Sequence, residues 1–185
     1  QIGSVQIGER VSRGYYAQHQ VDALNLDAVV YDEVLASATD SQRPRVRDVL
    51  GMFQFSGDTI YKKIGVLSGG EKARVSLTKI LLSPVNFLIM DEPTNHLDAV
   101  SKEALEYALM HYDGTLILIS HDRYFLDKIV SRVVELKNTR MIEYAGNYSY
   151  YLQKREEEDL RQQAIESRQK AENQKEDQYF CFYAF

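Results

Sequence analysis

Two adjacent carboxylates, Asp91 and Glu92, are the side chains of this sequence best suited to chemistry. The apolar residues Val85 and 87–90 precede them and favour a strand that is buried on both faces of a mostly parallel sheet. Pro93 ends this strand because it has no N–H to donate, and ligands of open α/β sheets bind where such strands end. Buried acids are costly unless a metal or a proton transfer uses them. We therefore predict that Asp91 holds Mg²⁺, directly or through water, and that Glu92 positions or deprotonates the water that attacks a γ-phosphate.

A second chemical signal lies upstream, in the motif LSGGEKAR. Ser68 and Glu71 have the spacing of a capping box, which predicts a helix that begins here and ends before Pro84. Gly69 and Gly70 each cost about 1 kcal/mol relative to alanine in a helix. In return they leave the free N–H groups and the positive end of the helix dipole accessible to an anion. We predict that this helix start binds a phosphate.

Three further polar residues are candidates for the same site. Residues 115–119 (TLILI) predict a second all-apolar strand, and His121 follows it, level with Glu92 in a parallel sheet, where it would contact a γ-phosphate. Gln18 lies either in a polar loop or in a Q-loop that reaches Mg²⁺ or the attacking water. Asp98 is predicted to cap the helix that follows it, and it either serves only as this cap or also faces a partner domain.

The sequence contains no P-loop, whose pattern is G-x-x-x-x-G-K-[ST]. Gly65 and Gly70 have the required spacing, but Glu71 and Lys72 follow them. A P-loop supplies most contacts to the β- and γ-phosphates, so we expect this chain on its own to bind nucleotide poorly. We also expect the missing P-loop to precede Gln1 in the complete protein.

Composition restricts the class of protein. The 185 residues suffice for one domain with a hydrophobic core, and 44% of them are hydrophobic. The net charge of −5 provides no overall field that attracts nucleic acid. A single cysteine, Cys181, excludes an internal disulfide framework and fits a reducing compartment. No apolar run approaches the roughly 20 residues of a membrane helix, and the N-terminus does not resemble a signal peptide. We therefore expect a soluble, cytoplasmic protein without a membrane segment.

The other patterns predict the elements that surround these motifs. Residues 1–16 resemble the end of a small antiparallel sheet. Helical spacing over residues 26–53 predicts two short helices whose apolar faces lie in the core. A helix over residues 123–131, followed by strands over residues 133–136 and 141–144, is expected to complete the sheet.

The C-terminal region has a different composition. Residues 152–178 are rich in Glu, Lys, Arg and Gln, and pairs such as Glu157 with Arg161 have the favourable i, i+4 order. This pattern predicts a solvated helix, and a coiled coil or an interdomain linker helix stays open. The aromatic run over residues 179–185 has no periodicity that predicts a role.

The motifs LSGGEKAR, FLIMDEPTNHLD and LISHDRYFLD, with YYAQHQ upstream, resemble the nucleotide-binding domain of ATP-binding-cassette (ABC) proteins. NHLD, SHDRYFLD and GNYSYYL resemble the soluble F class of this family. The contexts of YYAQHQ and LSGGEKAR resemble the second cassette of these two-cassette proteins. The resemblance covers about residues 1–153. It implies an α/β, P-loop NTPase-like fold, with a mostly parallel sheet and helices on both faces. A helical signature subdomain at about residues 26–82 would lie within a partial nucleotide-binding domain (1–151), followed by a charged helical tail (152–185).

The resemblance also implies a role for each candidate residue. Gln18 would be the Q-loop glutamine, and the signature would consist of Ser68, Gly69, Gly70 and Glu71. Asp91 would be the Mg²⁺ aspartate, and Glu92 would be the catalytic glutamate. Asp98 would be the D-loop aspartate, and His121 would be the switch histidine. Such proteins are ATP hydrolases that use ATP and Mg²⁺. Two cassettes pack head to tail, so that each nucleotide lies between the Walker motifs of one cassette and the signature of the other.

The resemblance implies a biological role as well. F-class proteins resemble translation factors that act on the ribosome, which would make the ribosome a partner of the complete protein. Two other functions stay open: the ATP-binding subunit of a membrane transporter, and a non-catalytic truncated cassette. Because the chain departs from the family pattern in lacking a P-loop and an adenine-stacking aromatic residue, we expect it to be inactive alone.

Overall fold

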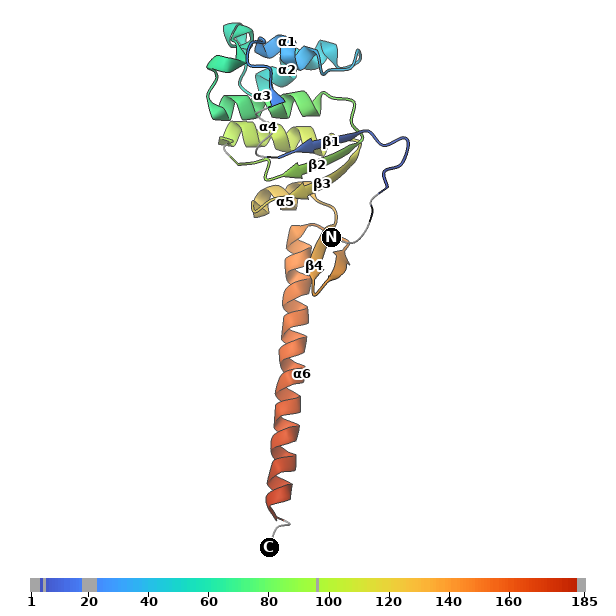
Figure 1. Ribbon diagram of the computed structural model, residues 1–185. Coiled ribbons are helices and arrows are strands. Elements are labelled where there is room, and N and C mark those ends of the chain that lie inside the picture. Colours follow the sequence, from blue (N-terminus) through green and yellow to red (C-terminus); the bar gives the residue numbers. More distant parts are fainter. Residues whose placement is uncertain (1–3, 5, 18–22, 96, 183–185) are drawn as a thin grey trace. The chain divides into compact units, whose positions relative to one another are not determined.

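A computed structural model describes residues 4, 6–17, 23–95 and 97–182 (Figure 1). The chain divides into two compact units, Gln1–Ile129 and Val130–Phe185. The unit boundary falls before a β-hairpin, whereas the predicted division of a cassette from its tail falls at residue 151. That division stays a prediction.

The first unit contains a three-stranded parallel sheet in the order β1-β2-β3 (Figure 1). Its strands are β1 (Arg13–Tyr16), β2 (Phe87–Asp91) and β3 (Thr115–Ile119). The strands predicted at residues 85–90 and 115–119 are therefore present. The antiparallel sheet predicted for residues 1–16 is wrong for the described residues, because β1 pairs with β2 in parallel. Gly14 permits this arrangement, since a Cβ atom there would lie only 3.2 Å from a side-chain carbon of Leu88 and 3.3 Å from one of Ile80.

The two faces of the sheet differ in burial. Leu88 and Met90 of β2 are buried, with 1% and 0% exposure. On the opposite face of β3, Ile117 and Ile119 are 46% and 53% exposed. The prediction of burial on both faces holds only in part for β2, because Phe87 and Ile89 on its other face are partly buried. The all-apolar strand β3 has one packed face and one open face.

Helices of the first unit pack on one another and on the buried face of the sheet (Figure 1). They are α1 (Val30–Leu35), α2 (Val46–Met52), α3 (Gly69–Leu81), α4 (Ala99–Met110) and α5 (Arg123–Ile129). Short 3₁₀ turns η2 (Arg43–Arg45), η3 (Gly57–Tyr61) and η4 (Ile64–Val66) connect the first three. The two short helices predicted over residues 26–53 and the helix predicted after Ser68 are confirmed. Their fully buried side chains, such as Val34, Leu50 and Leu77, form one core with β2.

The second unit contains a hairpin and a long helix. Strands β4 (Val133–Lys137) and β5 (Arg140–Tyr144) form a separate two-stranded antiparallel sheet, and α6 spans Tyr148–Phe182. The prediction that these strands complete the parallel sheet is wrong among the described residues. Asn138 and Thr139 explain the difference, because their φ values of 51° and 62° are those of a two-residue turn that joins neighbouring antiparallel strands.

The helix predicted over residues 152–178 is confirmed, and it is longer than predicted at both ends. Its side chains from residue 161 to 170 are exposed, as expected for a solvated charged helix. No helix in the described parts of the chain combines the length and the apolar character that spanning a membrane requires.

Candidate functional site

The carboxyl ends of β2 and β3 bring Glu92 and His121 together. Asp91, the last residue of β2, lies opposite Ile119, the last residue of β3. The backbone N–H of Glu92 donates to the carbonyl oxygen of Ile119 at 2.8 Å. The Nε2 atom of His121 lies 3.8 Å from Oε1 of Glu92. Both side chains thus occupy one edge of the sheet, as their places after neighbouring strands predict.

Glu92 has a strained backbone. Its φ of 49° lies in the left-handed region, which costs an L residue roughly 1–2 kcal/mol. Besides the bond to Ile119, the carbonyl oxygen of Glu92 accepts a hydrogen bond from the Asn95 N–H at 3.2 Å, which closes a turn. The Glu92 side chain is 20% exposed, whereas that of His121 is 99% exposed. The turn therefore holds a partly shielded carboxylate beside an imidazole that a ligand can reach.

Asp91 is the described residue best placed to bind a metal ion. It is partly buried at the end of β2, next to Glu92. No cluster of three or more His, Cys, Asp or Glu side chains occurs in the described part of the chain. Mg²⁺ does not require one, because it usually binds through one or two carboxylates together with water and substrate phosphates. The oxygen atoms of Asp91 fit such a site, and Gln18, the other predicted ligand, lies outside the described residues.

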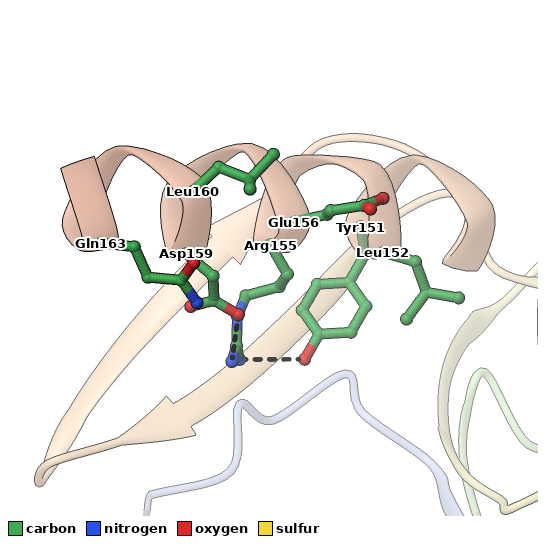
Figure 2. Close-up of a pocket in the computed structure, with 7 residues that line it drawn as sticks. All are labelled: Tyr151, Leu152, Arg155, Glu156, Asp159, Leu160 and Gln163. Carbon is green, nitrogen blue, oxygen red and sulfur yellow. Dashed lines mark hydrogen bonds and ion pairs between the residues drawn. The ribbon is translucent and has the colours of Figure 1, made fainter.

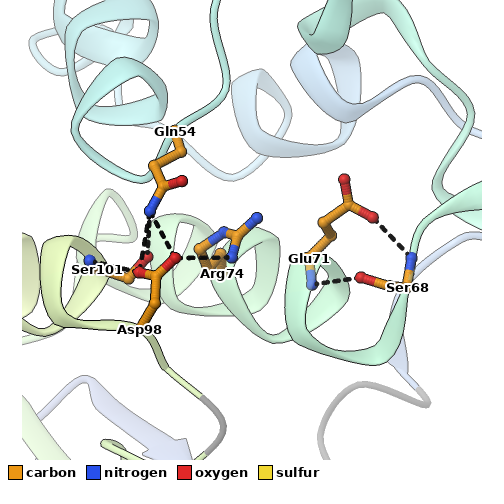
Figure 3. A network of polar contacts seen from close by, with 6 residues as sticks. All are labelled: Gln54, Ser68, Glu71, Arg74, Asp98 and Ser101. Atoms are coloured by element: carbon orange, nitrogen blue, oxygen red, sulfur yellow. Dashed lines mark hydrogen bonds and ion pairs between the residues drawn. The ribbon is translucent and has the colours of Figure 1, made fainter.

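The predicted capping box begins α3 (Figure 3). The Glu71 N–H donates to Oγ of Ser68 at 3.3 Å, and the Ser68 N–H donates to Oε2 of Glu71 at 2.8 Å. These bonds lower the pKa of Glu71. Ser68 and Gly69 are exposed, and a Cβ atom on Gly69 would meet nothing within 4 Å. A ligand therefore has free approach to the start of α3, although Glu71 already occupies one N–H group.

Asp98 is the N-cap of α4 and the centre of a polar network (Figure 3). Its Oδ1 accepts a hydrogen bond from the Ser101 N–H at 2.9 Å. The Nε2 atom of Gln54 donates to Oδ1 at 2.9 Å and to Oδ2 at 2.8 Å, and Nη1 of Arg74 lies 3.9 Å from Oδ2. Hydrogen bonds from Ser101 and then from Gln54 lower the pKa of Asp98 to about 2. The carboxylate is thus more than a cap, because it joins α4 to two other segments.

A second aspartate fixes the segment after β3. The Asp122 side chain accepts a hydrogen bond from Lys102 Nζ at 2.7 Å and another from the Phe125 N–H at 3.1 Å. The bond from Lys102 is the largest cause of the lowered pKa of Asp122. Asp122 therefore anchors the backbone next to His121 to both α4 and α5.

Sequence reasoning missed the contributions of Gln54, Arg74 and Lys102. Gln54 follows Phe53 in what reads as an ordinary link between helices, and its contact with Asp98 spans 44 positions. Arg74 belongs to the predicted motif LSGGEKAR, so that motif is the one signal that could have drawn attention to it.

A pocket lies elsewhere, in the second unit (Figure 2). Its volume is about 420 Å³, and residues of α6 line it, among them Tyr151, Arg155 and Leu160. The pocket shares no residue with the candidate site.

Comparisons with known proteins agree with this geometry. Residues 5–95 match the family "ABC transporter". The chain is 48% identical over 156 residues to the putative ATP-binding protein YdiF of Bacillus subtilis, covering 84% of this chain and 24% of that protein. It is 44% identical over 153 residues to ABC transporter F family member 5 of Arabidopsis thaliana, covering 82% and 22%. It is 33% identical over 172 residues to the probable ATP-binding protein YheS of Escherichia coli K12, covering 93% and 25%.

Solved structures share the fold. One is described as RNase-L Inhibitor, with a TM-score of 0.56 at 22% identity, covering 74% of this chain and 27% of that chain. Another is described as a dimeric, post-hydrolysis ATP-binding cassette bound to ADP and Pi, with a TM-score of 0.56 at 23% identity, covering 74% and 63%. At such identities the likeness concerns the fold alone, and the predicted α/β cassette fold is confirmed.

The parallel sheet, the capped glycine helix and the acid pair at the end of β2 define a segment of an ATP-binding cassette. The chain belongs to the F family of ABC proteins, as its relatives show. It spans about a quarter of the length of the curated relatives that it matches.

Proposed function

We propose that this chain supplies part of the ATP-hydrolysing machinery of an F-family ABC protein. The observation that carries the proposal is the placement of Glu92 and His121 at the carboxyl ends of adjacent parallel strands, 3.8 Å apart. In this proposal Asp91 binds Mg²⁺, and Glu92 orients or deprotonates the attacking water. His121 contacts the γ-phosphate and stabilises the charge that develops there. Bound Mg²⁺ would neutralise charge on the phosphates.

The start of α3 serves a second nucleotide. Ser68, Gly69 and Gly70 are the phosphate-binding residues of this proposal, and their target is a nucleotide held by a partner cassette. The exposure of Ser68 and Gly69 supports it, and so does the dimeric structure of the ATP-binding cassette that shares the fold. Gln18 and Asp98 complete the proposed set, with Gln18 near Mg²⁺ and Asp98 at the end of the loop that carries Glu92.

The chain alone binds ATP weakly in this proposal, because its 185 residues contain no P-loop. A titration of the chain with ATP and Mg²⁺ tests this point. Tight, magnesium-dependent binding would contradict it.

The complete protein acts on the ribosome in the cytoplasm, coupling ATP binding and hydrolysis to a step of translation. Family membership supports this role, since the resemblance that identifies the family also implies it. Co-sedimentation of the full-length protein with ribosomes in the presence of ATP is the expected result. Co-purification with a membrane subunit and no ribosome association would instead favour the ATP-binding subunit of a transporter.

The decisive experiment replaces Glu92 by glutamine in the full-length protein. We expect turnover of ATP to fall about 100-fold or more, since general-base catalysis typically contributes that much, while ATP remains bound. Glu103→Gln provides a matched control, because it makes the same chemical change at an exposed residue of α4. Unchanged turnover in Glu92→Gln would refute the assignment.

A further inference from the structure

Gln54 adopts a backbone conformation that its residue type does not favour. Its φ is 67°, in the left-handed region, which glycine adopts without a steric penalty but in which a residue with a Cβ atom is strained. Gln54 follows the end of α2, a position at which glycine is common. The backbone therefore gives no reason for glutamine at this position, and strain of this kind points to a use for the side chain.

The side chain of Gln54 has such a use in the network around Asp98 (Figure 3). Its Nε2 atom lies 2.9 Å and 2.8 Å from the two carboxylate oxygens of Asp98 and 3.3 Å from Oγ of Ser101. The same carboxylate lies 3.9 Å from Nη1 of Arg74, which in turn stacks over the ring of Phe55 at 5.6 Å. Gln54, in the segment after α2, thus forms hydrogen bonds with the N-cap and the first turn of α4.

These hydrogen bonds affect the loop that begins at Glu92 and ends at Asp98. At the start of the loop, the Glu92 N–H donates a hydrogen bond to the carbonyl oxygen of Ile119 in β3. At the end of the loop, Asp98 accepts hydrogen bonds from Ser101 of α4 and from Gln54 of the segment after α2. Hydrogen bonds therefore hold the described residues at both ends of this loop, and Gln54 contributes to those that are not part of the sheet.

We propose that Gln54 is a positioning residue for ATP hydrolysis: by holding Asp98, it keeps the loop that begins at Glu92 in the geometry that the attacking water requires. The inference rests on the proposed function, because it concerns the same reaction. Arg74 assists from α3. Its side chain is only 15% exposed, and its stacking on Phe55 fixes the guanidinium near Asp98.

Gln54→Gly is the informative variant. Glycine relieves the backbone strain and removes the side-chain donor, so stability and positioning should change in opposite directions. In the full-length protein we expect an unchanged or higher melting temperature. The kcat for ATP hydrolysis should fall roughly 10-fold to 100-fold, the size expected when a reacting group is displaced by about 1 Å. The KM for ATP should stay within about twofold, because the variant leaves the proposed phosphate contacts in place.

Asn138→Gly provides the matched control. Asn138 also has a left-handed φ, 51°, but it lies in the turn between β4 and β5, outside the candidate site. Introducing glycine at a left-handed position there should leave kcat unchanged. A loss of kcat in both variants would trace the effect to the backbone change and overturn the proposal.

Gln54→Glu tests the hydrogen bonds separately from the loss of side-chain length. The introduced carboxylate would face Asp98, so that repulsion between like charges replaces the two hydrogen bonds from Nε2. The kcat of this variant should therefore fall roughly 10-fold to 100-fold, as in Gln54→Gly. A kcat equal to that of the wild type would contradict the proposal.

Wild-type turnover and the effect of Glu92→Gln distinguish a failure of the proposed function from a failure of the positioning role of Gln54. If the wild type hydrolyses ATP, Glu92→Gln abolishes turnover and Gln54→Gly retains the full kcat, the proposed function stands and the positioning role is refuted. If Glu92→Gln leaves turnover intact, the proposed function itself is wrong.

Discussion

Replacing Asp98 separates its role as a helix cap from its charge. In Asp98→Ala, the Ser101 N–H loses its acceptor at 2.9 Å, and loss of an N-cap costs about 1 kcal/mol. The two bonds from Gln54 disappear as well, but the Asp98 side chain is 51% exposed, and water compensates for much of this loss. We expect the start of α4 to be destabilised by about 1–2 kcal/mol.

Asp98→Asn should cost less. Asparagine caps helices as well as aspartate does, so only the charge-dependent bonds to Gln54 and Arg74 weaken. Solvent screening at this half-exposed site limits that part to about 0.5 kcal/mol. The alanine variant should therefore lose clearly more stability than the asparagine variant.

The pH dependence follows from the lowered pKa of Asp98. Its folded value of about 2 lies below the ordinary 3.8, so the carboxylate stabilises the folded state above pH 3.8 and loses this contribution as the pH falls towards 2. The difference between the wild type and Asp98→Asn should therefore stay constant from pH 5 to pH 8. A difference that declines within this range would show that another group controls it.

Hydrogen exchange of the full-length protein, read by mass spectrometry, measures these effects locally. A cost of 1–2 kcal/mol corresponds to roughly 5-fold to 30-fold faster exchange in the first turn of α4. Asp98→Asn should accelerate it by only about twofold. Equal exchange in the wild type and Asp98→Ala would refute the reasoning that the carboxylate caps α4 in solution.

Two further predictions concern the start of α3 and the packing of α6 on the β4–β5 hairpin. Ser68→Ala removes the reciprocal cap of α3 and should cost about 1 kcal/mol there, seen as faster exchange in its first turn, whereas Ser68→Thr should keep most of the cap. Arg155→Met removes the ion pair with Glu135, whose side chain is only 15% exposed, and should loosen α6 from the β4–β5 hairpin. Limited proteolysis within residues 148–170 would report the second effect, with Arg155→Lys as its control, and unchanged cleavage in the methionine variant would contradict it.

Local chemistry made part of the structure predictable from the sequence. The capping box of Ser68 and Glu71 uses residues three positions apart, and Asp98 stands directly before its helix. Predicting that Glu92 and His121 lie close together required one more step, the assumption that the strands before them are parallel neighbours. The register of β2 and β3 satisfies that assumption.

Pairing between distant segments was not predictable in the same way. The strand at Arg13–Tyr16 pairs with β2, more than seventy positions away, and nothing in its short sequence specifies a parallel partner. The β4–β5 strands have the composition of sheet members, but the left-handed turn at Asn138 and Thr139 closes them on each other. Gln54 escaped notice for the same reason, because both its backbone conformation and its partner are set by tertiary structure.

The candidate site combines fixed supports with open contact surfaces. Asp122, Asp98 and the turn at Glu92 hold the backbone through hydrogen bonds within the first unit. His121, in contrast, is 99% exposed, and a Cβ atom on Gly69 would meet nothing within 4 Å. If the chain completed a nucleotide site by itself, residues that contact phosphate would be expected to lie in a cleft of its own. Their exposure instead suits a site that is closed by other protein surfaces, which is what the proposed head-to-tail pairing of cassettes requires.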